Sequence, residues 1–187
     1  DQQKSRLSAV SSLVAVSLTG IDRTNKTSLV GGLNSIAGVR MEERSPGSYR
    51  LNIRGSSLRA PFGVRNVKVY WNDIPVTDGG GGTYLNQFAL NNIATIEIAK
   101  GPAGSLYGAG TGGLLLLKSI DNQSTPGIQV DLAGGSYGLQ NLLSSAVWGN
   151  IKGKNQLSYA HQKTDGYRNH TYSKKDIFYR NNYLKTL

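Results

Sequence analysis

The sequence predicts an α+β domain, a small mixed sheet with short helices, followed by antiparallel strands of the kind that form transmembrane β-barrels. Three observations lead to this prediction. Short apolar runs of strand length alternate with glycine-containing turns over the first two thirds of the chain. One segment near the start has helical spacing instead. After Pro126, alternating segments are joined by short and long loops in turn.

The elements of the α+β part follow from local periodicity. Apolar residues recur at helical spacing within residues 24–39 (Leu29, Leu33, Ile36 and Ala37), with Thr27 or Ser28 as a cap and Gly38 as the stop. A short helical turn is expected at residues 88–92. Strands are expected where apolar residues alternate or run together, at residues 13–18, 39–42, 49–54, 67–71, 74–76, 93–98 and 114–117.

The pattern of apolar and polar residues changes after Pro126. Residues 128–132 alternate strictly, and further strands are expected at residues 156–161 and from Ile177 onward. Strands joined alternately by tight turns and longer loops are typical of a β-barrel. The sequence therefore predicts three parts, a mobile segment over residues 1–14, an α+β domain over residues 15–126, and about four barrel strands over residues 127–187.

Composition restricts the class of protein. The absence of cysteine excludes disulfides and thiolate metal sites. The longest uninterrupted apolar run, Leu114 to Leu117, is far shorter than the roughly 18 residues of a membrane-spanning helix. The net charge of +10 is spread along the chain. A soluble basic α+β module that binds nucleic acid or another anionic ligand therefore stays open as an alternative.

Two glycine motifs imitate enzyme signatures. Residues 108–113 fit the dinucleotide-binding pattern, but four leucines follow where that pattern requires a helix. Residues 134–138 fit the nucleophile elbow, with Asp165 and His170 later in the chain, yet too few residues remain to build a hydrolase sheet. The two histidines, without cysteine, do not predict a zinc site. We expect no catalytic residue, no cofactor and no metal site.

Residues 51–117 carry several blocks that resemble, in order and spacing, the plug domain of TonB-dependent outer-membrane receptors. The blocks are Ile53-Arg54-Gly55, VKVYWNDIP from Val67, and NIATIEIAKGPAGSLYGAGTGG from Asn92. Residues 37–39 resemble the exit of the plug's first helix, and residues 134–138 resemble the turn between the first two barrel strands. The resemblance covers most of residues 15–150.

This resemblance implies energised uptake across the bacterial outer membrane and not catalysis. The plug would occlude and gate a barrel embedded in outer-membrane lipid. The energy-coupling protein TonB would pull on the N-terminal segment from the periplasm. The ligand would be a scarce small molecule, a ferric chelate of the siderophore type before others, and no nucleic acid would be bound.

The resemblance also implies site residues. Arg54 and Lys100 stand where the family has arginines that pair with barrel carboxylates, and Glu97 belongs to the same contact region. Lys100 replaces the usual arginine and offers a point charge instead of a two-pronged contact. Ligand contacts are expected from two outward loops, residues 56–66 and 78–87, and the candidates are Arg59, Phe62, Arg65, Tyr84 and Gln87. The alternative, that these are solvated loop residues, stays open.

The family pattern is incomplete in this chain. No TonB-binding motif is recognisable in residues 1–14. The residues after Pro126 leave room for about four strands, whereas the family's barrel has about 22. We therefore expect the barrel to be incomplete in these 187 residues, with strand edges that need partners.

Overall fold

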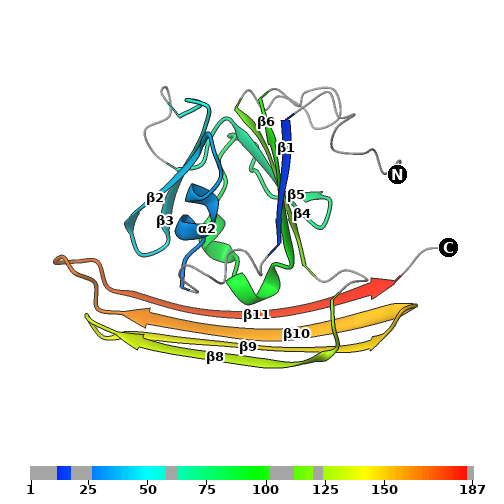
Figure 1. The fold of residues 1–187 in the computed structure, drawn as a ribbon. Helices are drawn as coiled ribbons and strands as arrows, with labels where there is room; N and C mark the ends of the chain where they lie inside the picture. Colours follow the sequence, from blue (N-terminus) through cyan, green and yellow to red (C-terminus); the bar gives the residue numbers. More distant parts are fainter. Residues whose placement is uncertain (1–11, 18–26, 58–62, 102–111, 120–123, 185–187) are drawn as a thin grey trace.

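The structure is a computed structural model that describes residues 12–17, 27–57, 63–101, 112–119 and 124–184. It has two layers (Figure 1). A mixed unit built from residues 12–119, called the N-terminal unit below, lies above a curved four-stranded sheet. The predicted boundary at Pro126 falls just before the first strand of that sheet and stays a prediction.

A five-stranded mixed sheet forms one side of the N-terminal unit. Its spatial order is β1 (Ser12–Ser17), β6 (Thr95–Lys100), β7 (Gly113–Lys118), β4 (Val67–Trp71) and β5 (Ile74–Pro75). The central pair β4–β7 is parallel and the other pairs are antiparallel. The strands predicted from apolar runs are therefore confirmed. Strand β6 begins two residues later than expected, at Thr95 instead of Ile93. The reason is that Ile93 is the C-cap of a 3₁₀ turn, η3 (Leu90–Asn92).

A hairpin and a short helix cover this sheet. The hairpin pairs β2 (Val39–Ser45) with β3 (Ser48–Ile53) through the predicted turn, where Gly47 has φ +81°. The expected helix within residues 24–39 is much shorter than predicted, since α2 spans only Val30–Asn34. Two of its five residues are glycines, which are poor helix formers. The N-cap is Leu29, which makes no side-chain capping bond, and not Thr27 or Ser28 as expected. Ser28 lies one residue earlier, and its Oγ accepts a hydrogen bond from the Val30 amide at 3.3 Å.

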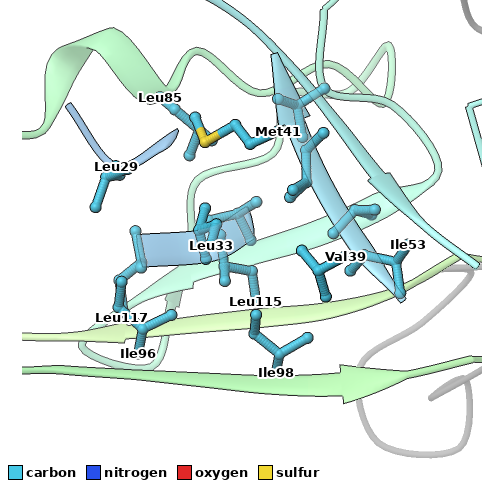
Figure 2. Packing of buried hydrophobic residues seen from close by; sticks show 14 of the residues in the cluster. Leu29, Leu33, Val39, Met41, Ile53, Leu85, Ile96, Ile98, Leu115 and Leu117 are labelled. Atoms are coloured by element: carbon cyan, nitrogen blue, oxygen red, sulfur yellow. The ribbon is translucent and has the colours of Figure 1, made fainter. Parts of the chain in front are cut away.

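The hydrophobic core lies between the sheet, the hairpin and α2 (Figure 2). Leu51, Ile53, Val69, Ile96, Ile98 and Leu115 have no exposed surface. Leu33 from α2 and Met41 from β2 close the core from the other side. Each fully buried aliphatic side chain contributes roughly 1.5–3 kcal/mol, so this cluster stabilises the unit on its own.

The four strands after residue 126 form a simple antiparallel meander. They are β8 (Gly127–Gly135), β9 (Leu139–Asn150), β10 (Gly153–Thr164) and β11 (Ser173–Leu184), ordered in space as in the chain. The turn after β8 contains Tyr137 and Gly138 at positive φ, and a two-residue turn follows β9. The loops between them have three, two and eight residues, so the first two are short and the third is long. The four strands confirm the prediction of antiparallel strands after Pro126.

Gly113 provides a test of the mixed sheet. It has φ +146°, and a Cβ there would lie 2.5 Å from the Ala99 carbonyl oxygen of the neighbouring strand. We predict that Gly113→Ala destabilises the N-terminal unit by about 2–4 kcal/mol, because backbone strain and overpacking add. The measurement is the denaturant midpoint from Trp71 fluorescence in a Trp148→Phe background.

The matched control is Gly127→Ala, where a Cβ meets nothing within 4 Å. It should shift the free energy of unfolding by less than about 0.5 kcal/mol. Equal midpoints for Gly113→Ala and Gly127→Ala would contradict the close approach of β6 and β7.

Candidate functional site

The candidate site is the contact between the N-terminal unit and one face of the four-stranded sheet. Strand alternation gives that sheet two different faces. The face toward the N-terminal unit, the covered face, carries Asn141, Leu143, Gln156, Ser158, Ala160, Ile177 and Tyr179. The opposite face, the open face, carries Ile128, Val130, Leu132, Trp148, Leu157, Phe178 and Leu184.

Asn72 joins three elements at one end of the contact. It lies in the β4–β5 turn, where Asn72 and Asp73 have φ +48° and +67°, values that asparagine and aspartate tolerate. Its Nδ2 donates to Ser119 Oγ at 2.9 Å and to the Tyr179 hydroxyl at 3.1 Å, while its Oδ1 accepts from the Ser119 amide at 2.9 Å. One amide side chain thus ties β4, the end of β7 and strand β11 together.

An aromatic cluster lies beside this amide. The Trp71 ring stacks on Phe88 with centroids 4.8 Å apart and meets Tyr179 edge to face at 5.4 Å. Trp71 Nε1 also donates to the Tyr179 hydroxyl at 3.2 Å. Tyr179 therefore contributes apolar contact and accepts two hydrogen bonds from the N-terminal unit.

Asn91 makes a second set of contacts from the 3₁₀ turn η3. Its Nδ2 donates to the backbone carbonyls of Ser144 on β9 at 2.9 Å and Tyr159 on β10 at 3.2 Å. Gln156 Nε2 donates back to the Asn91 carbonyl at 3.1 Å. The turn is therefore hydrogen-bonded to two adjacent strands of the sheet.

Asn92 and Ser158 meet where the contact is most deeply buried. Each side chain is 3% exposed, and Ser158 Oγ donates to Asn92 Oδ1. A buried polar group without a partner costs about 1–3 kcal/mol. Since each of these two groups is the other's partner, their hydrogen bond requires the N-terminal unit and the sheet to be correctly docked.

Only a small apolar cluster accompanies these hydrogen bonds. It consists of Ala89, Leu143 and Ala160, with Leu90 and Ile177 at its edge. Next to it lies a cavity of about 20 Å³, room for about one water molecule. Tyr49 lines this cavity, and burial, reinforced by the nearby Glu43 carboxylate, raises the pKa of Tyr49 to about 12. The contact is thus mainly polar, unlike the apolar core of the N-terminal unit.

The open face is apolar and exposed over much of its area. Ile128, Leu132, Phe178 and Leu184 are each 77% exposed or more. Exposed apolar side chains concentrated on one sheet face indicate a surface that something apolar covers. Within the described part of the chain, no helix has the length and apolarity needed to cross a membrane.

The contacts described for Arg54, Lys100 and Glu97 all lie within the N-terminal unit. Arg54 Nη1 donates to the Lys100 carbonyl at 3.4 Å, and Lys100 Nζ donates to the Ala37 carbonyl at 2.5 Å. Glu97 lies 3.7 Å from Lys118 in an ion pair. Their expected contacts with the barrel stay predictions.

The two loops expected to carry ligand contacts meet each other. Val64 and Thr83 form an isolated antiparallel bridge, and the Thr83 amide donates to the Val64 carbonyl at 3.0 Å. Arg65 and Tyr84 follow directly and are exposed, Tyr84 by 69%, and Gln87 is exposed as well. Arg59 and Phe62 lie outside the described residues. The structure thus brings Arg65 and Tyr84 to neighbouring positions, and a ligand role for them stays a prediction.

The motifs that imitate enzymes occupy plain structural positions. In the first motif, residues 108–111 lie outside the described residues, and Gly113 begins strand β7 where the dinucleotide pattern requires a helix. In the second motif, Gly134 and Gly135 end β8, and residues 136–138 form the β8–β9 turn. His161 pairs with Asp176 at 2.7 Å, not with Asp165. No group of three or more metal-ligating side chains gathers among the residues that the structure describes.

Sequence reasoning missed the residues that make the contact. Asn72 was interpreted only as a turn former, and Asn91, Asn92, Ser158 and Tyr179 were not singled out. A signal existed in β10, where Gln156, Ser158 and Ala160 place small and polar side chains on one face. Nothing local indicates that this face meets the Asn91–Asn92 pair, because the residues are more than sixty positions apart.

Replacing Asn72 tests the first set of contacts. We predict that Asn72→Ala costs about 1–3 kcal/mol more than Asp73→Ala, because it leaves the Ser119 amide without a partner and removes one of the two hydrogen bonds that the Tyr179 hydroxyl accepts. Both positions have positive φ, so the control carries the same backbone cost. The measurement is the denaturant midpoint of the chain, and equal losses for the two variants would contradict the described role of Asn72.

Comparison with known proteins identifies the fold. The family model of the TonB-dependent receptor plug domain matches residues 5–114. The vitamin B12 transporter BtuB of Vibrio vulnificus (strain CMCP6) is 25% identical over 130 residues, 68% of this chain and 20% of that protein.

Two solved structures share the architecture. The pyoverdine receptor FpvA from Pseudomonas aeruginosa PAO1 superposes with a TM-score of 0.73 at 16% identity, over 94% of this chain and 25% of that one. The unliganded ferric citrate transporter FecA gives a TM-score of 0.72 at 18% identity, over 96% of this chain and 29% of that one. The chain therefore spans between a fifth and a third of the length of these proteins. Since the family model covers more than half of it, the chain belongs to the TonB-dependent receptors, and its N-terminal unit is their plug.

Proposed function

We propose that this chain is the plug and first four wall strands of a transporter in the bacterial outer membrane that takes up a ferric chelate with energy delivered by TonB. The parts are residues 1–14 as the segment reached by TonB, residues 15–126 as the plug, and residues 127–187 as the start of the barrel. The observation that carries the proposal is the difference between the two faces of the sheet. One face is hydrogen-bonded to the plug, and the other is apolar and exposed.

Strand length supports a membrane position for the sheet. Strands β9, β10 and β11 each have 12 residues. Tilted by about 45°, such a strand rises about 28 Å, close to the roughly 30 Å hydrocarbon thickness of a bilayer. The open face then contacts lipid and the covered face lines the barrel interior, which a plug must fill.

The polar character of the contact suits a plug that moves. A hydrogen bond contributes only about 0.5–1.5 kcal/mol net, because water replaces the lost partner. Asn72, Asn91 and Asn92 can therefore exchange Tyr179, Ser144 and Ser158 for water at modest cost. The apolar core of the plug, by contrast, stays intact during such a displacement.

The position of β1 suits a pull from the periplasm. It is the edge strand of the five-stranded sheet and pairs only with β6, from Ser12 opposite Lys100 to Ser17 opposite Thr95. A force applied to residues 1–11 reaches this ladder before any other element. At one end of this ladder is Lys100. Its Nζ donates to the carbonyl of Ala37, which lies in the loop between α2 and β2.

The ligand is proposed from charge and from the relatives. The relatives are named for pyoverdine, ferric citrate and vitamin B12. Arg65 and Tyr84 each follow a residue of the Val64–Thr83 bridge, and both are exposed, so this surface offers a cation and an aromatic ring, which suits an anionic chelate. We place Arg59, Phe62 and Gln87 in the same ligand surface, with Arg54, Glu97 and Lys100 at contacts with later barrel strands.

A reversible lock between plug and sheet tests the proposal. The chain has no cysteine, so Ala89→Cys with Ala160→Cys introduces one pair across the apolar contact. In cells that carry the full-length protein as their only such receptor, we predict that oxidation of this pair lowers ferric chelate uptake at least tenfold. Surface binding of the chelate should persist, and dithiothreitol should restore uptake.

The matched control is Ala146→Cys with Leu157→Cys, which are cross-strand partners within the sheet. Oxidation of this pair should leave uptake unchanged, since the plug stays free. Uptake that survives the plug lock would contradict gating by plug displacement. Uptake of cobalamin but of no ferric chelate would contradict the proposed ligand and leave the gating intact.

A further inference from the structure

Two lysines face each other on the open face, close to the loop that joins β10 and β11. Lys163 of β10 is the direct register partner of Lys174 of β11. Alternation places both on the open face with Leu157 and Phe178. Like charges directly opposite each other destabilise an antiparallel pair. This arrangement is therefore unfavourable unless an anion lies between the two ammonium groups.

Among the described residues, Asp176 compensates the charge of Lys174 only in part, through an electrostatic interaction without an ion pair. Neither ammonium lies within ion-pairing distance of a carboxylate there. Asp176 is on the same face, but its Oδ1 accepts from His161 Nδ1 at 2.7 Å and from the Tyr159 hydroxyl at 2.8 Å. The carboxylate nearest along the chain is therefore already engaged by two other donors.

Asp165, in the loop itself, is directed elsewhere. Its amide donates to the Tyr137 carbonyl at 2.8 Å, and its carboxylate lies against Gly138 in the β8–β9 turn. The remaining charged side chain of the loop adds positive charge, since Arg168 is exposed with its guanidinium 4.9 Å from the Tyr167 ring centroid. The loop end of the sheet thus has an excess of cations.

The surface next to the lysine pair is apolar. Phe178 lies four residues from Lys174 on the same face, about 13 Å away along the strand. The exposed apolar side chains of the open face continue from there across all four strands, at Ile128, Val130, Leu132, Trp148, Leu157 and Leu184. Exposed tyrosines lie at the same end as the lysines, at Tyr137, Tyr167 and Tyr172. Tyrosine is enriched where a barrel meets the polar headgroups of a membrane.

We propose that Lys163 and Lys174 bind the phosphate group of a membrane lipid whose acyl chains lie on the apolar part of the open face. This proposal rests on the proposed function, because it requires the open face to contact lipid. A free phosphate ion fits the cation pair alone, whereas a phosphorylated amphiphile fits the cation pair and the apolar surface beside it. The lipid would also relieve the repulsion between the two lysines.

The test is a lipid titration of the full-length protein in mild detergent, followed by native mass spectrometry. The probes are phosphatidic acid and phosphatidylcholine with the same acyl chains. We predict that wild-type protein prefers phosphatidic acid at least tenfold, and that Lys163→Gln with Lys174→Gln removes that preference. The charge-matched control, Lys152→Gln with Arg180→Gln, changes residues away from the loop end and should keep the preference.

The thermal unfolding temperature provides a second readout, because a misfolded variant would unfold at a lower temperature, whereas the proposal predicts no such decrease. Without added lipid, the Lys163→Gln, Lys174→Gln protein should unfold at the same or a higher temperature than wild type, since the repulsion is gone. Phosphatidic acid should raise the unfolding temperature of wild type and not of this variant. Equal loss of preference in the two double variants, or displacement of the lipid by 10 mM inorganic phosphate, chosen as roughly a thousandfold excess over the lipid, would overturn the proposal.

Trp148 separates failure of this proposal from failure of the membrane assignment. It is 49% exposed on the open face. Lipids brominated in the acyl chain should quench wild-type fluorescence more than that of Trp148→Phe. Quenching together with no preference for phosphatidic acid overturns the lysine site alone, whereas absence of quenching overturns the placement of the open face in lipid.

Discussion

The structure depends on one constraint, that the buried polar groups of the covered face find hydrogen-bond partners on the plug. Gln156 and Ser158 point away from solvent toward the N-terminal unit. Asn92 Oδ1 accepts from Ser158 Oγ, and the Asn91 backbone carbonyl accepts from Gln156 Nε2. The matching is incomplete, since Gln156 Oε1 and Asn91 Oδ1 are buried without a hydrogen-bond partner among the described residues. A buried polar group that loses its partner costs about 1–3 kcal/mol. Hydrogen bonds therefore fix the position of the plug on the sheet, whereas the plug itself is held together by its apolar core.

This division of forces connects fold to function. The plug's core, with Leu51, Ile53 and Leu115 fully buried, holds the unit together by apolar burial that water cannot replace. The docking contact uses amides and hydroxyls, which water can replace. Under the proposed function, the plug stays folded while its contact with the sheet changes, and this combination of forces suits that requirement. The open face has a different requirement. Its exposed Ile128 and Phe178 favour contact with an apolar environment, which neither the plug nor water supplies.

Much of the fold could be predicted from the sequence because its signals are local. The strands β4 and β7 came from apolar runs, and β8, β10 and β11 from alternation. The helix within residues 24–39 was predicted too long, because periodicity does not register the cost of Gly31 and Gly32. Residues 139–147 lie in β9, although Leu139, Leu142, Leu143 and Ala146 recur at helical spacing, so this spacing alone does not decide between helix and strand. The docking residues could not be predicted, because pairs such as Asn92 and Ser158 exist only through tertiary structure.

The central claim is that Asn92 and Ser158 hold the plug on the sheet through their shared hydrogen bond. The most direct measurement is a double-mutant cycle of Asn92→Ala, Ser158→Ala and the double variant in the full-length protein. Plug unfolding is followed by Trp71 fluorescence with Trp148→Phe as background. The account predicts a coupling free energy of about 1 kcal/mol or more, with the double variant less destabilised than the sum of the single ones. Strictly additive losses would contradict the docked arrangement.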